Sequence, residues 1–448
     1  MCRHLVAIAA VVLSVATVAD ATGIGSVNQS ATATQAAVPT VPLIDAVSVF
    51  QTGELTTPIR DAALAAAKDV GEPAVVGTGF SAGLYRVRRG AAVIQQARGS
   101  GWAFPMSISS LPIEAIGAVM GRQVSGPISI GQVVMGQSTA TLRGAQVGDV
   151  IDLRASSGAL VSYTIGLIAP DTQIGSTEIV MTVAQAGALF GGTALPTRVL
   201  IYGMASRSAL DTALAARGLT TNSKVRIRHT WDPAEPDSTL SMVRTKQLLG
   251  EFDIDYANLS LAGWTAMSPT WVAANLPSSR RSYPTGILAR CHNVIHADLT
   301  AALQEVVNSG LAGYIDAANA NAYGGCATGQ ARFSRITGNL GSVSRHSWGQ
   351  PLDTNTVTNC QGCVPKMDCR VVRIFRKHNF AWGGNFLTPD GMHFEWVGER
   401  RDTVQFAAKY CPNPVGAAGT DEGTDPPLQP QGLAAIFGDD GFADEAHE

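Results

Sequence analysis

Two short stretches contain the residues best suited to chemistry, in a chain of 448 residues of which only 15% are charged. His346 and Asp353 belong to the first stretch, and Asp390 and His393 belong to the second. Two imidazoles and one carboxylate suit a catalytic zinc ion, which takes three protein ligands and keeps a fourth position for water. We therefore expect His346, Asp353 and His393 to hold zinc, with Asp390 as the base that deprotonates the bound water.

Residues next to these four have the types and positions to orient the ligands. The segment 392–396 alternates between apolar and polar side chains, as a strand does, so His393 and Glu395 would share one face. Ligand histidines usually hydrogen-bond to a further group that fixes their orientation. We expect Ser344, Glu395 and Trp396 to serve in this way, and Glu395 is also the alternative to Asp390 as general base.

Read together, the two stretches form one extended pattern. It runs Ser344-x-His346-x-x-Gly349-x-x-x-Asp353 and continues further along the chain as Asp390-x-x-His393-x-Glu395. This pattern resembles the M15 family of zinc peptidases, of the VanY-like, LAS type, which comprises D-alanyl-D-alanine carboxypeptidases and peptidoglycan endopeptidases. Residues 323–326, 346–349 and 382–384 look like the branch described as D-alanyl-D-alanine carboxypeptidase, and the resemblance covers about residues 283–396.

The resemblance implies a role for each matching residue. It makes His346, Asp353 and His393 ligands of Zn²⁺ and makes Asp390 the general base. It also implies helices packed on a small antiparallel sheet, and a peptide of peptidoglycan as the substrate. Removal of the last residue of a terminal D-Ala-D-Ala is the leading expectation, and an endopeptidase that cuts inside the stem peptide would use the same residues.

Two features of the pattern leave alternatives open. The family uses an arginine upstream of the first histidine to hold the substrate or the developing oxyanion, and both Arg332 and Arg335 are candidates. Pro351 stands where the family normally has alanine. Because proline favours an edge or a bulged strand, it could displace Asp353, so a catalytically degenerate binding or scaffold protein of the cell envelope is the alternative function.

The N-terminus predicts export. Residues 1–4 are a short basic start, residues 5–18 are almost wholly apolar, and residues 19–21 have the small-x-small form of a cleavage site, so we expect a signal peptide cleaved after Ala21. The apolar run is short for a membrane span, and an uncleaved anchor is the alternative. The formal net charge is −3, without a basic run interleaved with aromatic residues, which argues against a nucleic-acid partner.

Six cysteines remain after the signal peptide, and all lie in the last third of the chain. An even number of cysteines in an exported protein predicts disulfides, whose pairing the sequence leaves open. The alternative is a structural zinc site on Cys360, Cys363 and Cys369. The six disulfide candidates are Cys291, Cys326, Cys360, Cys363, Cys369 and Cys411.

The composition divides the chain into six segments and predicts the α+β class. Four runs, at residues 148–153, 163–169, 178–183 and 198–203, weakly resemble the extracytoplasmic domain of MacB/FtsX-type permeases, which implies a fold but not transport. This accessory domain could contact another protein of the cell envelope. The segments are a signal peptide (1–21), a linker (22–42), the α+β accessory domain (43–218), a connector with helices (219–280), the zinc peptidase domain (281–411) and a disordered acidic tail (412–448).

Local signals also mark individual helices. Ser206 can cap a helix that ends at Gly218, and Ser268 can cap another that begins at Pro269. His292 and His296 lie four residues apart, but the glutamate of the HExxH zinc motif is missing between them. We expect an ordinary amphipathic helix there rather than a metal site.

Overall fold

The computed structural model describes most of the chain after its N-terminal segment. The described residues are 44–51, 54–192, 194–221, 225–233, 235–260, 263–323, 325–336, 339–403, 408–413 and 431–437, and of 323, 334–336 and 339–342 only the backbone is described. The predicted signal peptide and linker lie outside them. Helices and strands are mixed throughout, which confirms the expected α+β class. Within the described part, no helix is both long and apolar enough to cross a bilayer.

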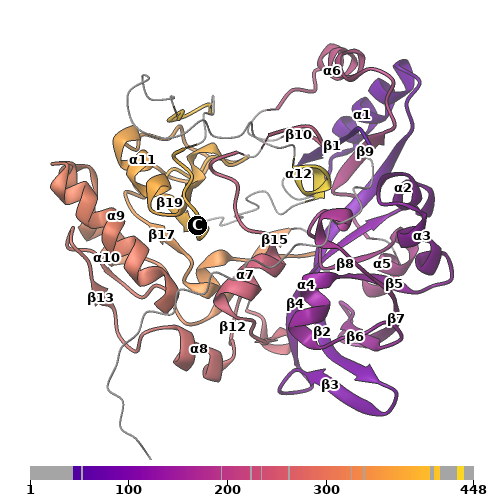
Figure 1. Cartoon of the computed structure of the whole chain (residues 1–448), viewed down its shortest axis with the longest axis horizontal. Coiled ribbons are helices and arrows are strands. Elements are labelled where there is room, and N and C mark those ends of the chain that lie inside the picture. Colours follow the sequence, from indigo (N-terminus) through magenta and orange to yellow (C-terminus); the bar gives the residue numbers. More distant parts are fainter. Residues whose placement is uncertain are drawn as a thin grey trace, which may run out of the picture. The chain divides into compact units, whose positions relative to one another are not determined.

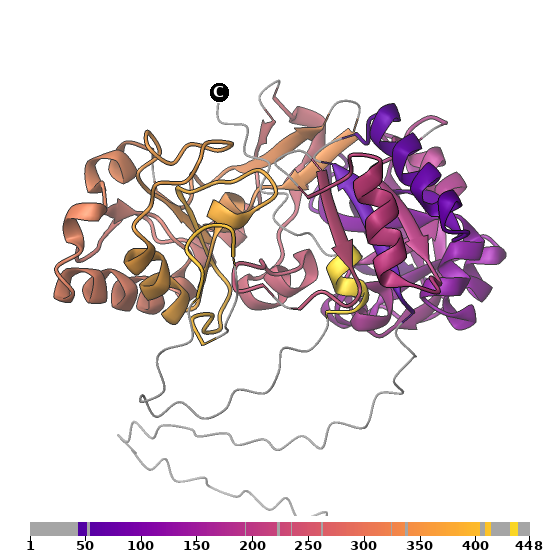
Figure 2. The same cartoon turned by 90° about the horizontal axis from the view of Figure 1, so that it is seen from above.

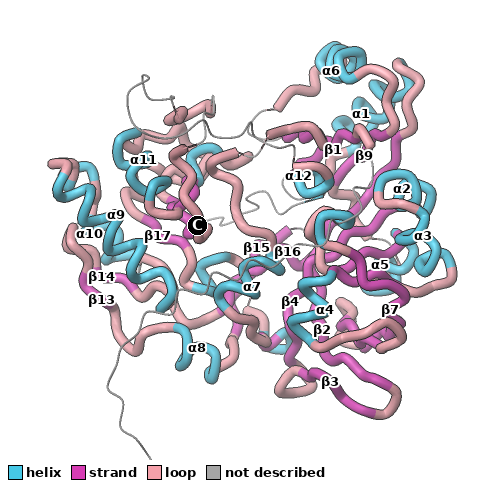
Figure 3. The backbone as a smooth tube through the Cα atoms, in the orientation of Figure 1, coloured by secondary structure: helices cyan, strands magenta, loops and turns pink. Residues whose placement is uncertain are grey.

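Six strands of the N-terminal half close into a barrel (Figure 1, with the strands in magenta in Figure 3). The closure depends on β2 (Ala74–Arg89), a long strand that pairs with β6 on one side and with β4 on the other. The ring runs β2-β6-β7-β5-β8-β4 and returns to β2. Such a ring has no unpaired edge, and many of its buried side chains form one apolar cluster. The other five strands are β4 (Trp102–Leu111), β5 (Val133–Gly136), β6 (Val150–Arg154), β7 (Leu160–Ala169) and β8 (Ile179–Thr182).

The first residues of β2 belong to an open part of the same sheet, in the order β10-β1-β9-β2. Side chains of β9 alternate between its two faces. Val199 and Ile201 pack with α1 and α6, whereas Leu200 and Tyr202 pack with α2 and α3. Because β10 pairs with β1, the N-terminal fold continues past residue 218, the predicted end of the accessory domain. The elements are β1 (Ala46–Gln51), β9 (Arg198–Tyr202), β10 (Val225–His229), α1 (Thr57–Asp69), α2 (Ile113–Val119), α3 (Arg122–Ser129) and α6 (Arg207–Ala216).

A short helix from the C-terminal segment packs on this open sheet. α12 (Leu433–Phe437) is buried and lies beside β1 and β10 (Figure 2). The guanidinium of Arg198 donates a hydrogen bond to the carbonyl of Ile436 and lies 5.3 Å from the ring centroid of Phe437. The prediction that residues 412–448 are disordered throughout is therefore wrong for this run, because its apolar side chains are buried against the N-terminal fold.

The C-terminal part is built on a three-stranded antiparallel sheet in the order β17-β19-β18. Leu352, Phe394 and Trp382 lie directly opposite one another on its apolar face, in one core with α9 and α11. The rings of Phe375 in α11 and Phe394 are stacked with centroids 4.1 Å apart. The opposite face carries the polar residues of the second stretch. The elements are β17 (Pro351–Asp353), β18 (Phe380–Trp382), β19 (His393–Trp396), α9 (His296–Asn308) and α11 (Cys369–Lys377).

Further short helices and strands belong to these parts of the chain. They are β3 (Ala92–Gln96), α4 (Gln137–Arg143), α5 (Val183–Leu189), α7 (Met242–Leu249), β11 (Ile254–Asp255), β12 (Trp264–Thr265), α8 (Pro269–Asn275), β13 (Arg281–Ser282), β14 (Leu288–Ala289), α10 (Ala317–Tyr323), β15 (Ala331–Ile336) and β16 (Asn339–Val343).

The segment predicted as a connector is built into both halves. On α7, the Lys246 ammonium donates to both carboxylate oxygens of Glu178, at 2.9 Å each, and lies 3.3 Å from the carboxylate of Glu251. The side chains of Lys246 and Glu178 are fully buried. Met242 and Leu249 of the same helix join the apolar core of the C-terminal part. The segment is therefore part of the folded core.

We expect Lys246→Met to lower the free energy of unfolding by roughly 3–5 kcal/mol, because the Glu178 carboxylate stays buried after its nearest cation is removed. Urea denaturation measures this loss, and Lys68→Met, at an exposed lysine of α1, is the matched control. The double variant Lys246→Met/Glu178→Gln should recover part of the stability. A Lys246→Met variant as stable as the Lys68→Met control would contradict the expectation.

Candidate metal centre

The two strands that carry Asp353 and His393 bring these residues face to face. Asp353 of β17 is directly opposite His393 of β19, and its Oδ1 lies 3.2 Å from His393 Nδ1. Opposite residues of an antiparallel pair have their Cβ atoms about 4.5–5.5 Å apart, which suits two ligands of one ion. Both side chains are buried. Strand pairing alone therefore brings two of the predicted ligands together.

His346 reaches this pair from a single 3₁₀ turn, η5 (Arg345–Trp348). Ser344 caps the turn, because its Oγ accepts a hydrogen bond from the His346 N–H at 3.2 Å. Gly349 ends the turn with a φ of 66°, in the left-handed region that glycine adopts without strain. His346 Nε2 then lies 3.1 Å from Asp353 Oδ2. Ser344 thus fixes the backbone of the turn that carries His346.

The three predicted ligands converge, with one ligand atom from each lying within 4.8 Å of the others. The outer nitrogen of each imidazole faces an acceptor: His346 Nδ1 is 2.7 Å from the Cys326 carbonyl oxygen, and His393 Nε2 is 3.3 Å from Glu395 Oε2. In the neutral rings, protons on the outer nitrogens leave lone pairs on His346 Nε2 and His393 Nδ1, beside the Asp353 carboxylate. This donor set fits a zinc ion.

The pKa values of Asp353 and His393 are shifted in opposite directions. Burial raises the pKa of the Asp353 carboxyl, but the charges and hydrogen bonds of His346 and His393 outweigh it and hold that pKa well below its usual range. Burial lowers the pKa of His393, but hydrogen bonds to Asp353 and Glu395 and the charges of Asp353 and Asp390 raise it well above the ordinary value. The pair is therefore held as carboxylate and imidazolium when no ion competes for the imidazole.

Asp390 lies three residues before His393 and is fully buried. Its N–H donates to the Gly383 carbonyl at 2.8 Å, and its own carbonyl accepts from the His393 N–H at 3.2 Å. Gly383 has no room for a side chain, since a Cβ there would lie 2.5 Å from the Asp390 carbonyl oxygen and 3.0 Å from His393 Cβ. The absence of a side chain at Gly383 thus lets this loop approach Asp390 and His393 closely.

Glu395 is held by two residues that the sequence analysis missed. Gln350 Nε2 donates to Glu395 Oε1 at 3.1 Å, and Arg345 Nε lies 3.8 Å from the same oxygen. With its other oxygen facing His393, the Glu395 carboxylate is engaged in orienting that ring, which favours a supporting role over that of general base. The sequence signal that could have identified Arg345 and Gln350 is their position: both are long polar side chains in the stretch that carries the predicted ligands.

Other predicted residues lie elsewhere or outside the described side chains. Strand alternation turns the Trp396 indole to the face opposite His393, where its Nε1 donates to the Asp298 carboxylate at 2.7 Å, so its predicted support of a ligand histidine is wrong. The Arg332 guanidinium lies 5.3 Å from the ring centroid of Trp264. The side chain of Arg335 lies outside the described residues.

Pro351 does not remove Asp353 from the site. It is the first residue of β17, an edge strand of the sheet, and it lies opposite Glu395. Proline is tolerated at the first position of an edge strand. The register from Pro351 to Asp353 is regular, so Asp353 lies opposite His393.

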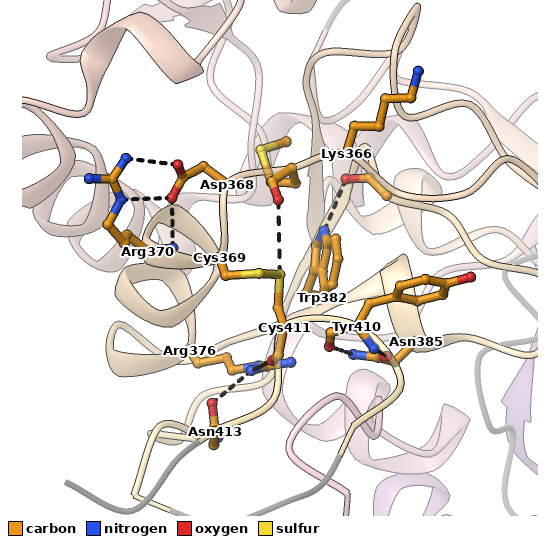
Figure 4. The surroundings of a disulfide bond; sticks show 12 residues. Lys366, Asp368, Cys369, Arg370, Arg376, Trp382, Asn385, Tyr410, Cys411 and Asn413 are labelled. Atoms are coloured by element: carbon orange, nitrogen blue, oxygen red, sulfur yellow. Dashed lines mark hydrogen bonds and ion pairs between the residues drawn. A yellow bond between two sulfur atoms is a disulfide. The ribbon is translucent and has the colours of Figure 1, made fainter. Parts of the chain in front are cut away.

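All six candidate cysteines are paired, as Cys291–Cys326, Cys360–Cys363 and Cys369–Cys411. This confirms the expected disulfides and leaves no thiol for the alternative zinc site. Figure 4 shows the disulfide at the start of α11, where Arg376 donates to the Cys411 carbonyl at 2.6 Å and to Asn413 Oδ1 at 2.7 Å. In the same view, Asn385 Nδ2 donates to the Tyr410 carbonyl at 3.0 Å, so the segment 408–413 is tied to the loop after β18.

His292 and His296 lie apart from the metal centre, as expected. His292 is buried, its Nε2 lies 3.1 Å from the Leu249 carbonyl oxygen, and its Nδ1 accepts from the Val294 N–H at 3.2 Å. Burial lowers the pKa of His292 to about 4. The ring is therefore neutral and structural.

We expect His292 to weaken the fold in acid. The unfolded chain takes up a proton at this imidazole below about pH 6.5, whereas the folded chain does so only near pH 4. Because the unfolded state binds more protons in this window, the free energy of unfolding falls as the pH drops through it, by up to roughly 3 kcal/mol. Urea titrations from pH 7 to 4 should show a smaller fall for His292→Gln than for the wild-type chain, and equal falls would argue against this role.

Comparison with known proteins points to the same residues. Residues 337–396 match a family model described as D-alanyl-D-alanine carboxypeptidase, of the M15 peptidases, and the match includes His346, Asp353, Asp390 and His393. No curated protein matches the chain. Among solved structures, the periplasmic region of MacB from Actinobacillus actinomycetemcomitans is similar over 41% of this chain and 87% of that one, with 11% identity and a TM-score of 0.25. The family match confirms the resemblance of residues 337–396 to M15 metallopeptidases.

Proposed function

We propose that this chain is an exported zinc metallopeptidase that cleaves peptidoglycan stem peptides, with a C-terminal domain of the LAS type. The observation that carries the proposal is the convergence of His346 Nε2, the Asp353 carboxylate and His393 Nδ1 inside the range of the family match. The three disulfides support an extracytoplasmic location, because disulfides persist in oxidising compartments. A D-alanyl-D-alanine carboxypeptidase is the first choice within this class.

The residues around the centre fit hydrolysis of a peptide bond. Zinc at the three ligands would lower the pKa of a bound water and polarise the scissile carbonyl. Asp390, buried beside His393, takes the proton of the attacking water and returns it to the leaving amine. Glu395 keeps the ring of His393 in place throughout. An arginine of β15, Arg332 or Arg335, holds the substrate or the developing oxyanion.

The N-terminal half has a separate proposed role. In the part of the chain that the structure describes, the group around His346 is the one set of His, Cys, Asp or Glu side chains with metal-ligand geometry, and the barrel contributes none of its members. We therefore propose that the barrel contacts another protein of the cell envelope and that the C-terminal part alone carries the chemistry.

Digestion of purified muropeptides tests the function. The full chain loaded with one zinc should release a single alanine from pentapeptide stems, as seen by mass spectrometry of the products. His346→Ala and His393→Ala should lose both zinc and activity, because each removes one of three ligands. Larger fragments would instead identify an endopeptidase. A wild-type chain that remains metal-free after incubation with zinc and dialysis would support the degenerate scaffold and sink the enzymatic proposal.

Asp390 and Glu395 can be told apart as general base. We expect Asp390→Asn to lower kcat by about 10²–10⁴-fold while zinc stays bound, because the variant loses proton transfer but no ligand. Glu395→Gln should keep most of the kcat of the zinc-loaded enzyme and weaken zinc binding, because it disturbs the ring of His393. Steady-state kinetics with metal analysis of both variants gives the answer, and the reverse pattern would make Glu395 the base.

A further inference from the structure

A two-residue segment outside the ligand stretches contacts two of the three proposed ligands. The carbonyl oxygen of Cys326 accepts the hydrogen bond from His346 Nδ1 at 2.7 Å. The carbonyl oxygen of the preceding residue, Gly325, accepts from the Asp353 N–H at 3.2 Å. Consecutive carbonyls of one loop thus orient ligands that come from two different elements, η5 and β17.

This segment is fixed by a covalent bond. The disulfide Cys291–Cys326 joins it to the chain just before α9, and both cysteines are buried. The next residue, His292, donates its N–H to the carbonyl of Gly349 at 3.0 Å, at the end of the turn that carries His346. Each pair among three segments is therefore linked. The disulfide joins the segments of Cys291 and Cys326, and one hydrogen bond joins each of these segments to the turn that carries His346.

Packing leaves the segment little freedom. Gly325 has a φ of +67°, and a Cβ there would lie 2.7 Å from the Cβ of Ala289 in β14. Gly349 is equally enclosed, because a Cβ there would lie 3.0 Å from the His292 backbone nitrogen and 3.1 Å from the Ala327 Cβ. A shift of the segment by a few tenths of an ångström would thus be passed on to its neighbours rather than absorbed.

We propose that the Cys291–Cys326 disulfide is a positioning element of the metal centre, an inference that rests on the proposed zinc function. The disulfide fixes the Cys326 carbonyl, this carbonyl keeps the proton of His346 on Nδ1, and Nε2 is left as the ligand atom. Oriented partners of ligand histidines are typically worth about 10–100-fold in metal affinity. The Gly325 carbonyl holds the backbone of Asp353 at the same time, so loss of the disulfide loosens two ligands together.

The test compares two disulfides of the same domain in the full chain. Cys291→Ala/Cys326→Ala should bind zinc about 10–100-fold more weakly than the wild type in competition with a chelator, and should give an altered absorption spectrum with Co²⁺. Cys369→Ala/Cys411→Ala is the matched control, because that disulfide lies against Met367 and Arg376 rather than a ligand (Figure 4). The control should keep the zinc affinity and Co²⁺ spectrum of the wild type.

A second variant guards against simple loss of folding. Gly325→Ala keeps all six cysteines but displaces the segment, and we expect the same weakening of zinc binding with the near-ultraviolet circular dichroism of the folded chain retained. Wild-type zinc affinity in Gly325→Ala, or equal losses in the two double-cysteine variants, would overturn the inference. Failure of the wild-type chain to bind zinc would overturn the proposed function itself, so the two failures are distinguishable.

Discussion

The antiparallel register of β17 and β19 is the constraint on which the proposed centre depends. It sets Asp353 opposite His393 and, one step along, Leu352 opposite Phe394. Because side chains alternate with a period of two, a shift of one strand by one residue would turn its polar side chains into the apolar core and expose its apolar side chains. The stacked rings of Phe375 and Phe394 penalise that shift. The apolar core therefore sets the spacing of Asp353 and His393.

The centre is also coupled to the N-terminal half through α7. Arg345, next to the proposed ligand His346, donates to the Leu240 carbonyl at 2.6 Å and to Thr245 Oγ1 at 3.0 Å, while its Nε faces Glu395. Lys246, the residue after Thr245, is the buried partner of Glu178 in the barrel. Thr245 of α7 thus contacts Arg345 beside the proposed centre, and Lys246 of the same helix contacts Glu178 at the end of the barrel. A displacement of α7 would therefore disturb both contacts.

Sequence reasoning succeeded where the signal is local and failed where it depends on distant pairing. Residue type and spacing identified the three converging residues, and Ser206 and Ser268 marked the starts of α6 and α8. The closure of the barrel could not be predicted, because β2 pairs with strands far along the chain. The contact of the Cys326 carbonyl with His346 could not be predicted from the sequence, because every residue has a backbone carbonyl. The run of α12 could be read as a docking peptide, but a solvated tail was the preferred and wrong prediction for it, because composition describes a segment's own solubility and not the surface that it meets.

The charges of the centre bear on whether it is a metal site or a degenerate remnant. A buried carboxylate is costly unless it is paired, yet Asp353 faces two imidazoles at 3.1 and 3.2 Å. The fold can therefore keep this cluster without an ion. The ring of His393 then stays protonated, with Nδ1 facing Asp353 and Nε2 facing Glu395. A metal ion must displace that proton, so protonation and metal binding compete for the same nitrogen. The acceptors on the outer nitrogens, the Cys326 carbonyl for His346 and Glu395 for His393, match the arrangement that is usual around ligand histidines, so the geometry of the cluster is compatible with a metal site.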